Sequence, residues 1–66
     1  MNDKLHWYMI VYFDGNTYMN THIGRTSKRI SKRNIEDNRK FCNVGEDYMC
    51  FNICYMGYMT AEEFEG

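Results

Sequence analysis

Residues 4–13 constrain the fold most strongly, because their polarity alternates with a period of two. One set of alternate positions is wholly apolar: Leu5, Trp7, Met9, Val11 and Phe13. The other set is amphipathic: His6, Tyr8, Ile10 and Tyr12. Successive side chains of a strand point to opposite faces, so this pattern predicts a β-strand with one fully apolar face.

A β-hairpin is expected directly after this strand. Asp14-Gly15-Asn16 has the residue types of a tight turn, and residues 17–24 alternate again. A three-residue loop would pair Phe13 with Thr17 and place the apolar sets of both strands on one face. Such a loop needs a left-handed residue, which Asn16 or Gly15 tolerates. We therefore expect the three-residue register.

From Thr26 the chain becomes polar and helical. Ser31 is the expected N-cap, with Ser27 as a competing start. Three opposite-charge pairs have the i,i+4 spacing that supports an exposed helix: Lys32–Glu36, Arg33–Asp37 and Glu36–Lys40. The apolar stripe is thin and consists of Ile30, Ile35, Phe41 and Cys42. This helix is expected to pack through one narrow face.

Residues 48–59 alternate once more and predict a third strand, in which Gly57 marks a bulge or a close backbone approach. Thr60 and Glu63 have the spacing of a capping box, followed by one helical turn. The predicted fold is therefore α+β: a three-stranded antiparallel sheet with one helix packed on one face (ββαβ) and a short C-terminal helical turn. Whether the third strand pairs with the first or the second stays open.

Tyrosines are expected to gather on one face of this sheet. If the wholly apolar sets face the helix, the opposite face collects most of the six tyrosines. The candidate partner-binding residues are Tyr8, Tyr12, Tyr18, His22, Tyr48 and Tyr58. Interface cores are enriched in aromatic residues and Met. An ordinary solvated face, a homodimer interface and a recognition surface for another molecule all fit this pattern.

The central part of the chain is basic although the net charge is only −1. Residues 25–40 carry seven Lys and Arg against Glu36 and Asp37, and the acidic residues dominate afterwards. The candidate basic surface consists of Arg25, Lys28, Arg29, Lys32 and Arg33. These side chains could contact the phosphates of a nucleic acid or nucleotide. A solvated helix with its own ion pairs is the alternative.

Size and motif content argue against catalysis. A chain of 66 residues is expected to be one small domain, residues 1–66, with little room for a water-excluding active site. The sequence has no phosphate-binding loop and no nucleophile elbow. Metal binding would require His6 and His22 to converge with cysteines, and their spacing matches no zinc pattern. We expect neither an enzyme nor a cofactor.

The three cysteines, Cys42, Cys50 and Cys54, are an odd number without a C-x-x-C pair. This favours buried, reduced thiols and a cytoplasmic protein. The apolar run over residues 5–13 lacks the flanks of a signal peptide and is too short to cross a membrane.

Three stretches form a further pattern: Tyr8–Phe13, Gly24–Ile30 and Ser31–Asp37. An aromatic strand, a glycine-containing second strand that leads into T-S-K-R-I, and a helix that opens near I-E-D resemble small proteins encoded by phages of Gram-positive hosts. The resemblance covers about a third of the chain. It implies an accessory protein that binds and inhibits a host or bacterial-defence protein in the host cytoplasm, without a catalytic residue.

Overall fold

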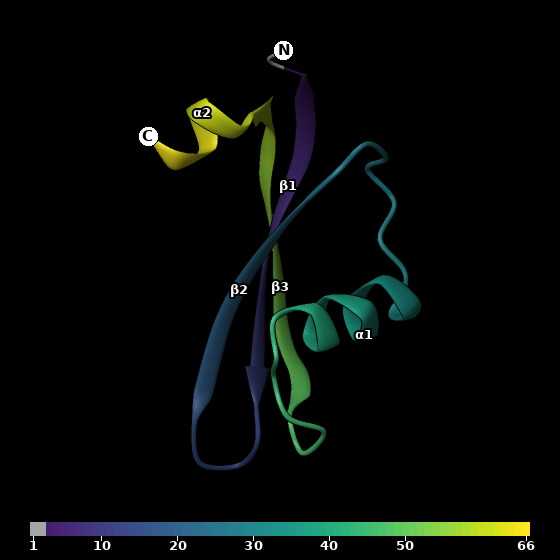
Figure 1. The fold of residues 1–66 in the computed structure, drawn as a ribbon, viewed down its shortest axis with the longest axis vertical. Coiled ribbons are helices and arrows are strands. Elements are labelled where there is room, and N and C mark those ends of the chain that lie inside the picture. Colours follow the sequence, from purple (N-terminus) through teal and green to yellow (C-terminus); the bar gives the residue numbers. More distant parts are fainter. Residues whose placement is uncertain (1–2) are drawn as a thin grey trace.

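The computed structural model describes residues 3–66, which form a three-stranded antiparallel sheet and two helices. The elements in chain order are β1 (Lys4–Phe13), β2 (Tyr18–Arg25), α1 (Lys32–Phe41), β3 (Met49–Thr60) and α2 (Ala61–Glu65). The strand order is β2-β1-β3, so β3 pairs with β1 and the first strand of the chain is central. α1 lies beside the lower half of the twisted sheet and α2 at its upper end (Figure 1). The predicted α+β fold is confirmed.

The hairpin between β1 and β2 has a different register from the expected one. Phe13 pairs with Tyr18 instead of Thr17, which leaves a four-residue loop. The Asp14 carboxylate shapes this loop by accepting hydrogen bonds from the backbone N–H groups of Asn16 at 2.8 Å and Thr17 at 2.7 Å. Gly15 adopts the left-handed region at φ +100°. A slip of one residue turns every side chain of β2 to the other face.

The helix α1 packs on the tyrosine-bearing face of the sheet, so the expectation that it covers the wholly apolar set is wrong. The buried cluster consists of Tyr8, Ile10, Tyr12 and Val44. We call this side of the sheet the α1 face and the other side the opposite face. Both tyrosines reach across to the backbone beyond the strands: Tyr8 donates to the carbonyl of Lys28, and Tyr12 to that of Ile35. Tyrosine is buried favourably when its hydroxyl finds such a partner.

A buried amide connects α1 to two strands. Asn38 lies in the middle of α1, and its Nδ2 donates to Tyr12 Oη at 3.1 Å and to Thr21 Oγ1 at 2.9 Å. Thr21 in turn donates to the carbonyl of Ile10, at 2.9 Å. Burial raises the pKa of Tyr12 above its ordinary value. Among residues 3–66, no buried side-chain nitrogen or oxygen lacks a partner.

Local sequence signals define both ends of α1. Ser31 is the N-cap, as predicted, and exchanges hydrogen bonds with Asn34 in a capping box. After the helix, Asn43 takes φ +61°, its N–H donates to the Lys40 carbonyl, and the Val44 N–H donates to that of Arg39. This is a Schellman motif, and it turns Val44 into the core. No helix in the described part of the chain is long and apolar enough to span a membrane.

The exposed surface of α1 differs from two expectations. Ile30, Ile35 and Cys42 pack against the core, but Phe41 is 88% exposed. The three expected i,i+4 ion pairs do not form. Within residues 3–66 the only ion pair joins Glu36 to Arg39, one turn along the same helix.

β3 carries two irregularities in its pairing with β1, and α2 follows it directly. The register shifts between Trp7 and Tyr8 and again between Val11 and Tyr12. Gly57 lies at the first shift with φ +128°, which confirms the predicted bulge. The predicted capping box at Thr60 is present and begins α2. The Phe64 ring of α2 stacks on Trp7 of the opposite face, with centroids 4.3 Å apart.

Replacement of Asn38 by Ala should lower the free energy of unfolding by about 2 kcal/mol, because two buried hydroxyls lose their donor. Urea unfolding followed by circular dichroism measures the change. Asn20→Ala, at an exposed position of β2, is the control and should stay within about 0.5 kcal/mol of the parent. Equal effects of both replacements would contradict the structural role of the network.

Acid should weaken the hairpin turn through Asp14. The N–H groups of Thr17 and Asn16 hold the pKa of the Asp14 carboxyl below its ordinary 3.8. Since the folded-state pKa is the lower one, this stabilisation is complete above the ordinary value and is lost as the pH falls through the folded-state pKa. Asp14→Asn should therefore flatten the decline of the melting temperature below about pH 4.

Asp37→Asn, at an exposed position of α1, is the matched control and should leave that decline unchanged. Glu63 keeps an acid dependence in every variant, because the Thr60 N–H holds the pKa of its carboxyl down as well. If the melting temperature of Asp14→Asn declined with acid as steeply as that of the parent, the role of the turn carboxylate would be contradicted.

Candidate functional site

Three aromatic rings pack against one another at the hairpin end of the opposite face. The aromatic cluster consists of Phe13 from β1, Tyr18 from β2 and Phe51 from β3. Phe13 stacks on Tyr18 with centroids 4.3 Å apart, and Phe51 lies 5.6 Å from Phe13 and 5.3 Å from Tyr18. Tyr18 is 53% exposed and Phe51 59%. Each strand thus contributes one ring to the cluster, and those of β2 and β3 are exposed while Phe13 is half-buried.

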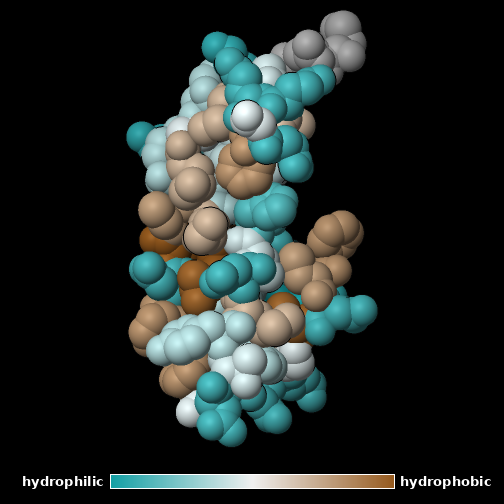
Figure 2. All heavy atoms as spheres, turned by 90° about the vertical axis from the view of Figure 1, so that its left-hand side faces the viewer, coloured by the Kyte–Doolittle hydropathy of each residue, from teal (hydrophilic) through white to brown (hydrophobic). Residues whose placement is uncertain are grey.

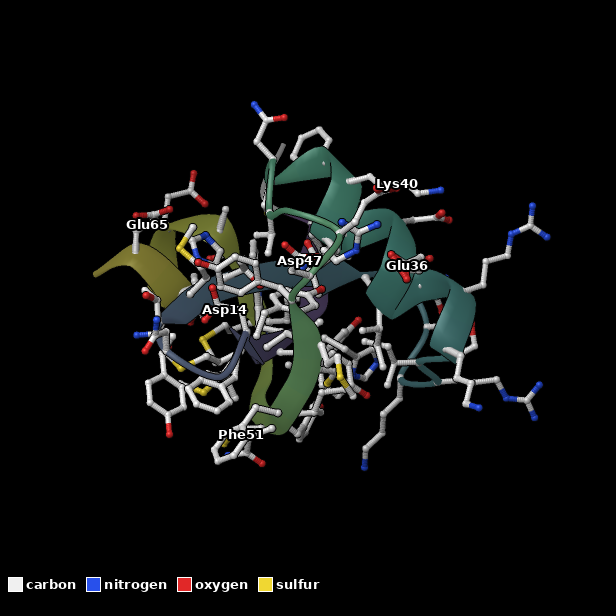
Figure 3. All side chains as sticks on the ribbon, turned by 90° about the horizontal axis from the view of Figure 1, so that it is seen from below. Asp14, Glu36, Lys40, Asp47, Phe51 and Glu65 are labelled. Atoms are coloured by element: carbon white, nitrogen blue, oxygen red, sulfur yellow. The ribbon has the colours of Figure 1, made fainter. Side chains whose placement is uncertain are left out.

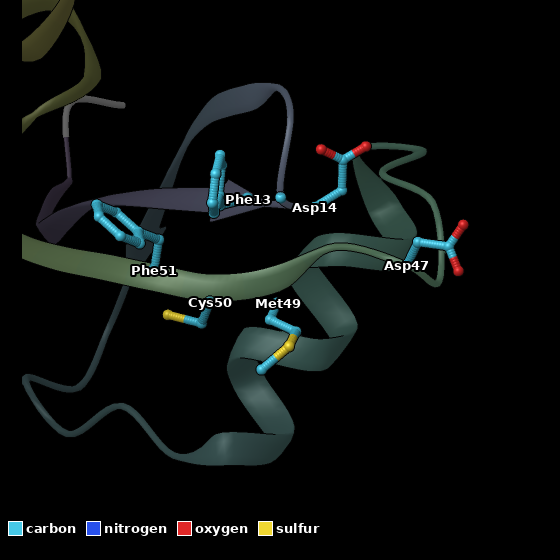
Figure 4. A pocket seen from close by; sticks show the side chains of 7 residues that line it. Phe13, Asp14, Asp47, Met49, Cys50 and Phe51 are labelled. Carbon is cyan, nitrogen blue, oxygen red and sulfur yellow. The ribbon is translucent and has the colours of Figure 1, made fainter.

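The pairing of the strands explains this cluster. Phe13 and Tyr18 are direct partners in the antiparallel ladder, so their rings lie on one face. The register shift of β3 next to Tyr12 turns Phe51 toward Phe13 (Figure 4). Neither described helix covers the cluster, since α1 lies on the other face and α2 stacks on Trp7 at the far end of the sheet.

A hollow of about 340 Å³ adjoins the cluster. Its lining comes from the hairpin turn and from the start of β3: Phe13, Asp14, Gly15, Asp47, Met49, Cys50 and Phe51. Asp14 and Asp47 stand at its rim, while Phe51 extends from the β3 ribbon away from α1 (Figures 3 and 4). The site therefore combines apolar rings with two carboxylates at its edge.

Apolar side chains also reach the surface elsewhere on the molecule. Seen from the side of β2, they gather at mid-height, between more polar regions (Figure 2). Phe41 of α1 is the most exposed large apolar side chain, but it belongs to no aromatic pair among residues 3–66. It differs from the aromatic cluster in this respect, because no other ring is paired with it.

The structure divides the predicted tyrosine face among three environments. Tyr8 and Tyr12 are buried in the core and Tyr48 packs against it, so the expectation that these residues share an open surface is wrong. Tyr18 and His22 lie on the opposite face because of the shifted register of β2. Tyr58 is 56% exposed but lies on the α1 face, paired with His6. Sequence reasoning missed the exposed Phe51 and the half-buried Phe13 as members of a surface cluster.

The predicted basic residues do form a continuous group in the chain, from the end of β2 to the first turn of α1. Arg25 Nε donates to the carbonyl of Arg29 at 3.2 Å, which ties the two ends of the connecting loop together. Lys28 Nζ lies 5.0 Å from the centroid of the Tyr55 ring, a cation–π geometry. In the part of the chain that the structure describes, no carboxylate is paired with any of them.

The histidines and cysteines do not converge. His6 lies on the α1 face, where its Nδ1 is 2.9 Å from Tyr55 Oη, whereas His22 lies beside Trp7 and Phe64 on the opposite face. No three His, Cys, Asp or Glu side chains within residues 3–66 are placed to hold a metal ion.

All three cysteines are free, but Cys50 and Cys54 are exposed, so the expectation of buried thiols is wrong for these two. Desolvation raises the pKa of Cys50. A raised pKa lowers the thiolate fraction at neutral pH, and the thiolate is the nucleophilic form.

Comparisons of this chain with protein-family models, with curated proteins and with solved structures find no match. Its function is therefore inferred from the two surfaces described above, the aromatic cluster and the basic group.

Proposed function

We propose that this chain is a non-enzymatic interaction protein that binds a protein partner through the aromatic cluster. The observation that carries the proposal is the mutual packing of Phe13, Tyr18 and Phe51, with two of the rings more than half exposed. Binding energy in interfaces concentrates in a few rigid aromatic anchors, which lose little conformational entropy on binding. Rings that already support one another meet this requirement.

The partner is a host or bacterial-defence protein, and binding inhibits it in the host cytoplasm. This part of the proposal rests on the resemblance of the strand and helix motifs to small proteins encoded by phages of Gram-positive hosts. A chain of 66 residues suits a stoichiometric role, because it acts by covering a surface and needs no active site. The carboxylates of Asp14 and Asp47 at the rim favour a partner surface with basic residues around an apolar centre.

Affinity capture from bacterial lysate, with nuclease added, tests this proposal. The parent chain should retain one protein at a fixed stoichiometry. The double variant Tyr18→Ser/Phe51→Ser should then bind that purified partner at least about 30-fold more weakly, since truncation of a central aromatic anchor costs about 2 kcal/mol or more.

Phe41→Ser is the matched control, because it removes a more exposed ring outside the cluster. It should bind like the parent. Full affinity of the double variant, or a loss confined to Phe41→Ser, would show that the aromatic cluster is not the binding surface.

A second candidate function is the binding of single-stranded nucleic acid or a nucleotide by the basic group. The observation that favours it is the position of Lys28, which lies over the exposed Tyr55 ring and belongs to a basic group that is unpaired with carboxylates among the described residues. Cations that follow a phosphate backbone and aromatic rings that stack on bases are the usual elements of such a site.

Fluorescence anisotropy with a labelled single-stranded oligonucleotide, repeated over a salt series, tests this second candidate. The affinity should fall with salt by about 0.7 logarithmic units per neutralised phosphate and per tenfold rise in salt. The variant Arg29→Ala/Lys32→Ala should reduce this slope. Arg39→Ala, at a residue already paired with Glu36, is the control. An affinity that does not change with salt would exclude the candidate.

A further inference from the structure

β3 is an edge strand that lacks the charges and the proline that often keep strand edges apart, although its pairing with β1 carries two irregularities. Within residues 3–66 it pairs only with β1, so its outer backbone groups have no strand partner. Its 12 residues, MCFNICYMGYMT, include no Lys, Arg, His, Asp, Glu or Pro. Natural sheets usually protect a long edge with charges or proline. The other edge strand, β2, is shorter and contains His22 and Arg25.

We propose that two copies of this chain associate through their β3 edges, antiparallel and centred on Cys54, to form one continuous six-stranded sheet. The occupant of the edge is a second copy because β3 is complementary to itself. The 12 residues of the strand carry no charge, so no paired strand residue faces a like charge. Antiparallel pairing across a two-fold axis also requires that one residue lies opposite its own copy, because hydrogen-bonded and non-hydrogen-bonded pairs alternate.

The side-chain directions along β3 select Cys54 as that residue. Paired residues of adjacent strands point to the same face of the sheet. On this rule the pairing with β1 assigns Cys50, Ile53, Tyr55 and Tyr58 to the α1 face, and Asn52, Cys54, Gly57 and Met59 to the opposite face. Phe51 joins the opposite face through its contact with Phe13.

A pairing centred on Cys54 matches these faces across the new interface. Ile53 then lies opposite Tyr55 of the second copy, Cys50 opposite Tyr58, and Phe51 opposite Gly57, and each pair shares a face. If Ile53 lay on the two-fold axis instead, Phe51 would pair with Tyr55 of the second copy. If Tyr55 lay on the axis, Ile53 would pair with Gly57 of the second copy. Both of these alternatives join residues from different faces. The irregularity near Phe51 also lies opposite the one near Gly57 only in the Cys54 register.

A groove beside the edge suits the second copy. It has a volume of about 380 Å³ and lies between α1 and the start of β3, and both apolar and charged side chains line it, among them Tyr12, Ile35, Glu36 and Arg39. In the Cys54 register, Tyr58 of the second copy lies opposite Cys50 on the α1 face and reaches this groove. Tyr58 is largely exposed in a single copy, and in the symmetric dimer the Tyr58 ring of each copy would be buried against the other copy. Packing of a ring into a preformed groove adds apolar burial to the backbone hydrogen bonds.

Two asparagines provide a matched test of the edge. Asn52 of β3 and Asn20 of β2 both pair with Val11 of β1, so they occupy the same level on the two edges of one sheet. By multi-angle light scattering, the parent should have the mass of two chains. Asn52→Lys should raise the dimer dissociation constant by about tenfold or more, and Asn20→Lys should leave it unchanged. A monomeric parent at millimolar concentration would overturn the proposal, as would an effect of Asn20→Lys alone.

Cysteine cross-linking tests the register. Variants that keep one exposed cysteine each, Cys42→Ser/Cys50→Ser and Cys42→Ser/Cys54→Ser, are oxidised with copper–phenanthroline. The variant that keeps Cys54 should form a disulfide-linked dimer, since directly opposed residues have Cα atoms about 4.5–5.5 Å apart, within disulfide range. The variant that keeps Cys50 should remain unlinked, because its thiol faces Tyr58. Faster linkage through Cys50 than through Cys54 would overturn the register.

Discussion

The buried amide of Asn38 is the interaction on which the rest of the structure depends. It bonds to the hydroxyls of Tyr12 and Thr21, and thus holds the middle of α1 to the central strand and to one edge strand at once. The helix offers only a thin apolar stripe, so hydrophobic burial alone specifies its position weakly. The polar network determines which face of the sheet α1 covers. The choice of face in turn leaves the aromatic cluster in solvent.

Signals that are local in the chain were sufficient to predict the elements. Period-two alternation gave the three strands, and the capping residues Ser31 and Thr60 gave the helix starts within one residue. The register of the hairpin was not predictable in this way, because it depends on the hydrogen bonds of the Asp14 carboxylate in the folded loop. The face of β1 that is buried was ambiguous for another reason: tyrosine suits a core as well as a surface, and only its hydroxyl partners decide.

The two candidate surfaces also differ in how far local sequence signals reveal them. The basic group was visible in the sequence because its residues follow one another along the chain. The aromatic cluster was not, since it draws one ring from each strand and requires the slipped hairpin register and the displaced pairing of β3. The irregularity at Gly57 had a glycine as its signal, whereas the one beside Phe51 has no such residue in the strand. The alternation of residues 48–59 therefore did not reveal that Phe51 stands largely in solvent.

The central position of β1 has a consequence for the nascent chain. β1 is made before the other four described elements, and β2 can pair with it as soon as the hairpin has left the ribosome. The other edge of β1 stays unpaired until α1 and then β3 have been synthesised, because β3 lies far from β1 in the chain. During that interval an apolar strand is open to chaperones and to strands of other nascent chains. Until β3 has been made, the hairpin thus exposes an edge of β1 that the folded chain covers.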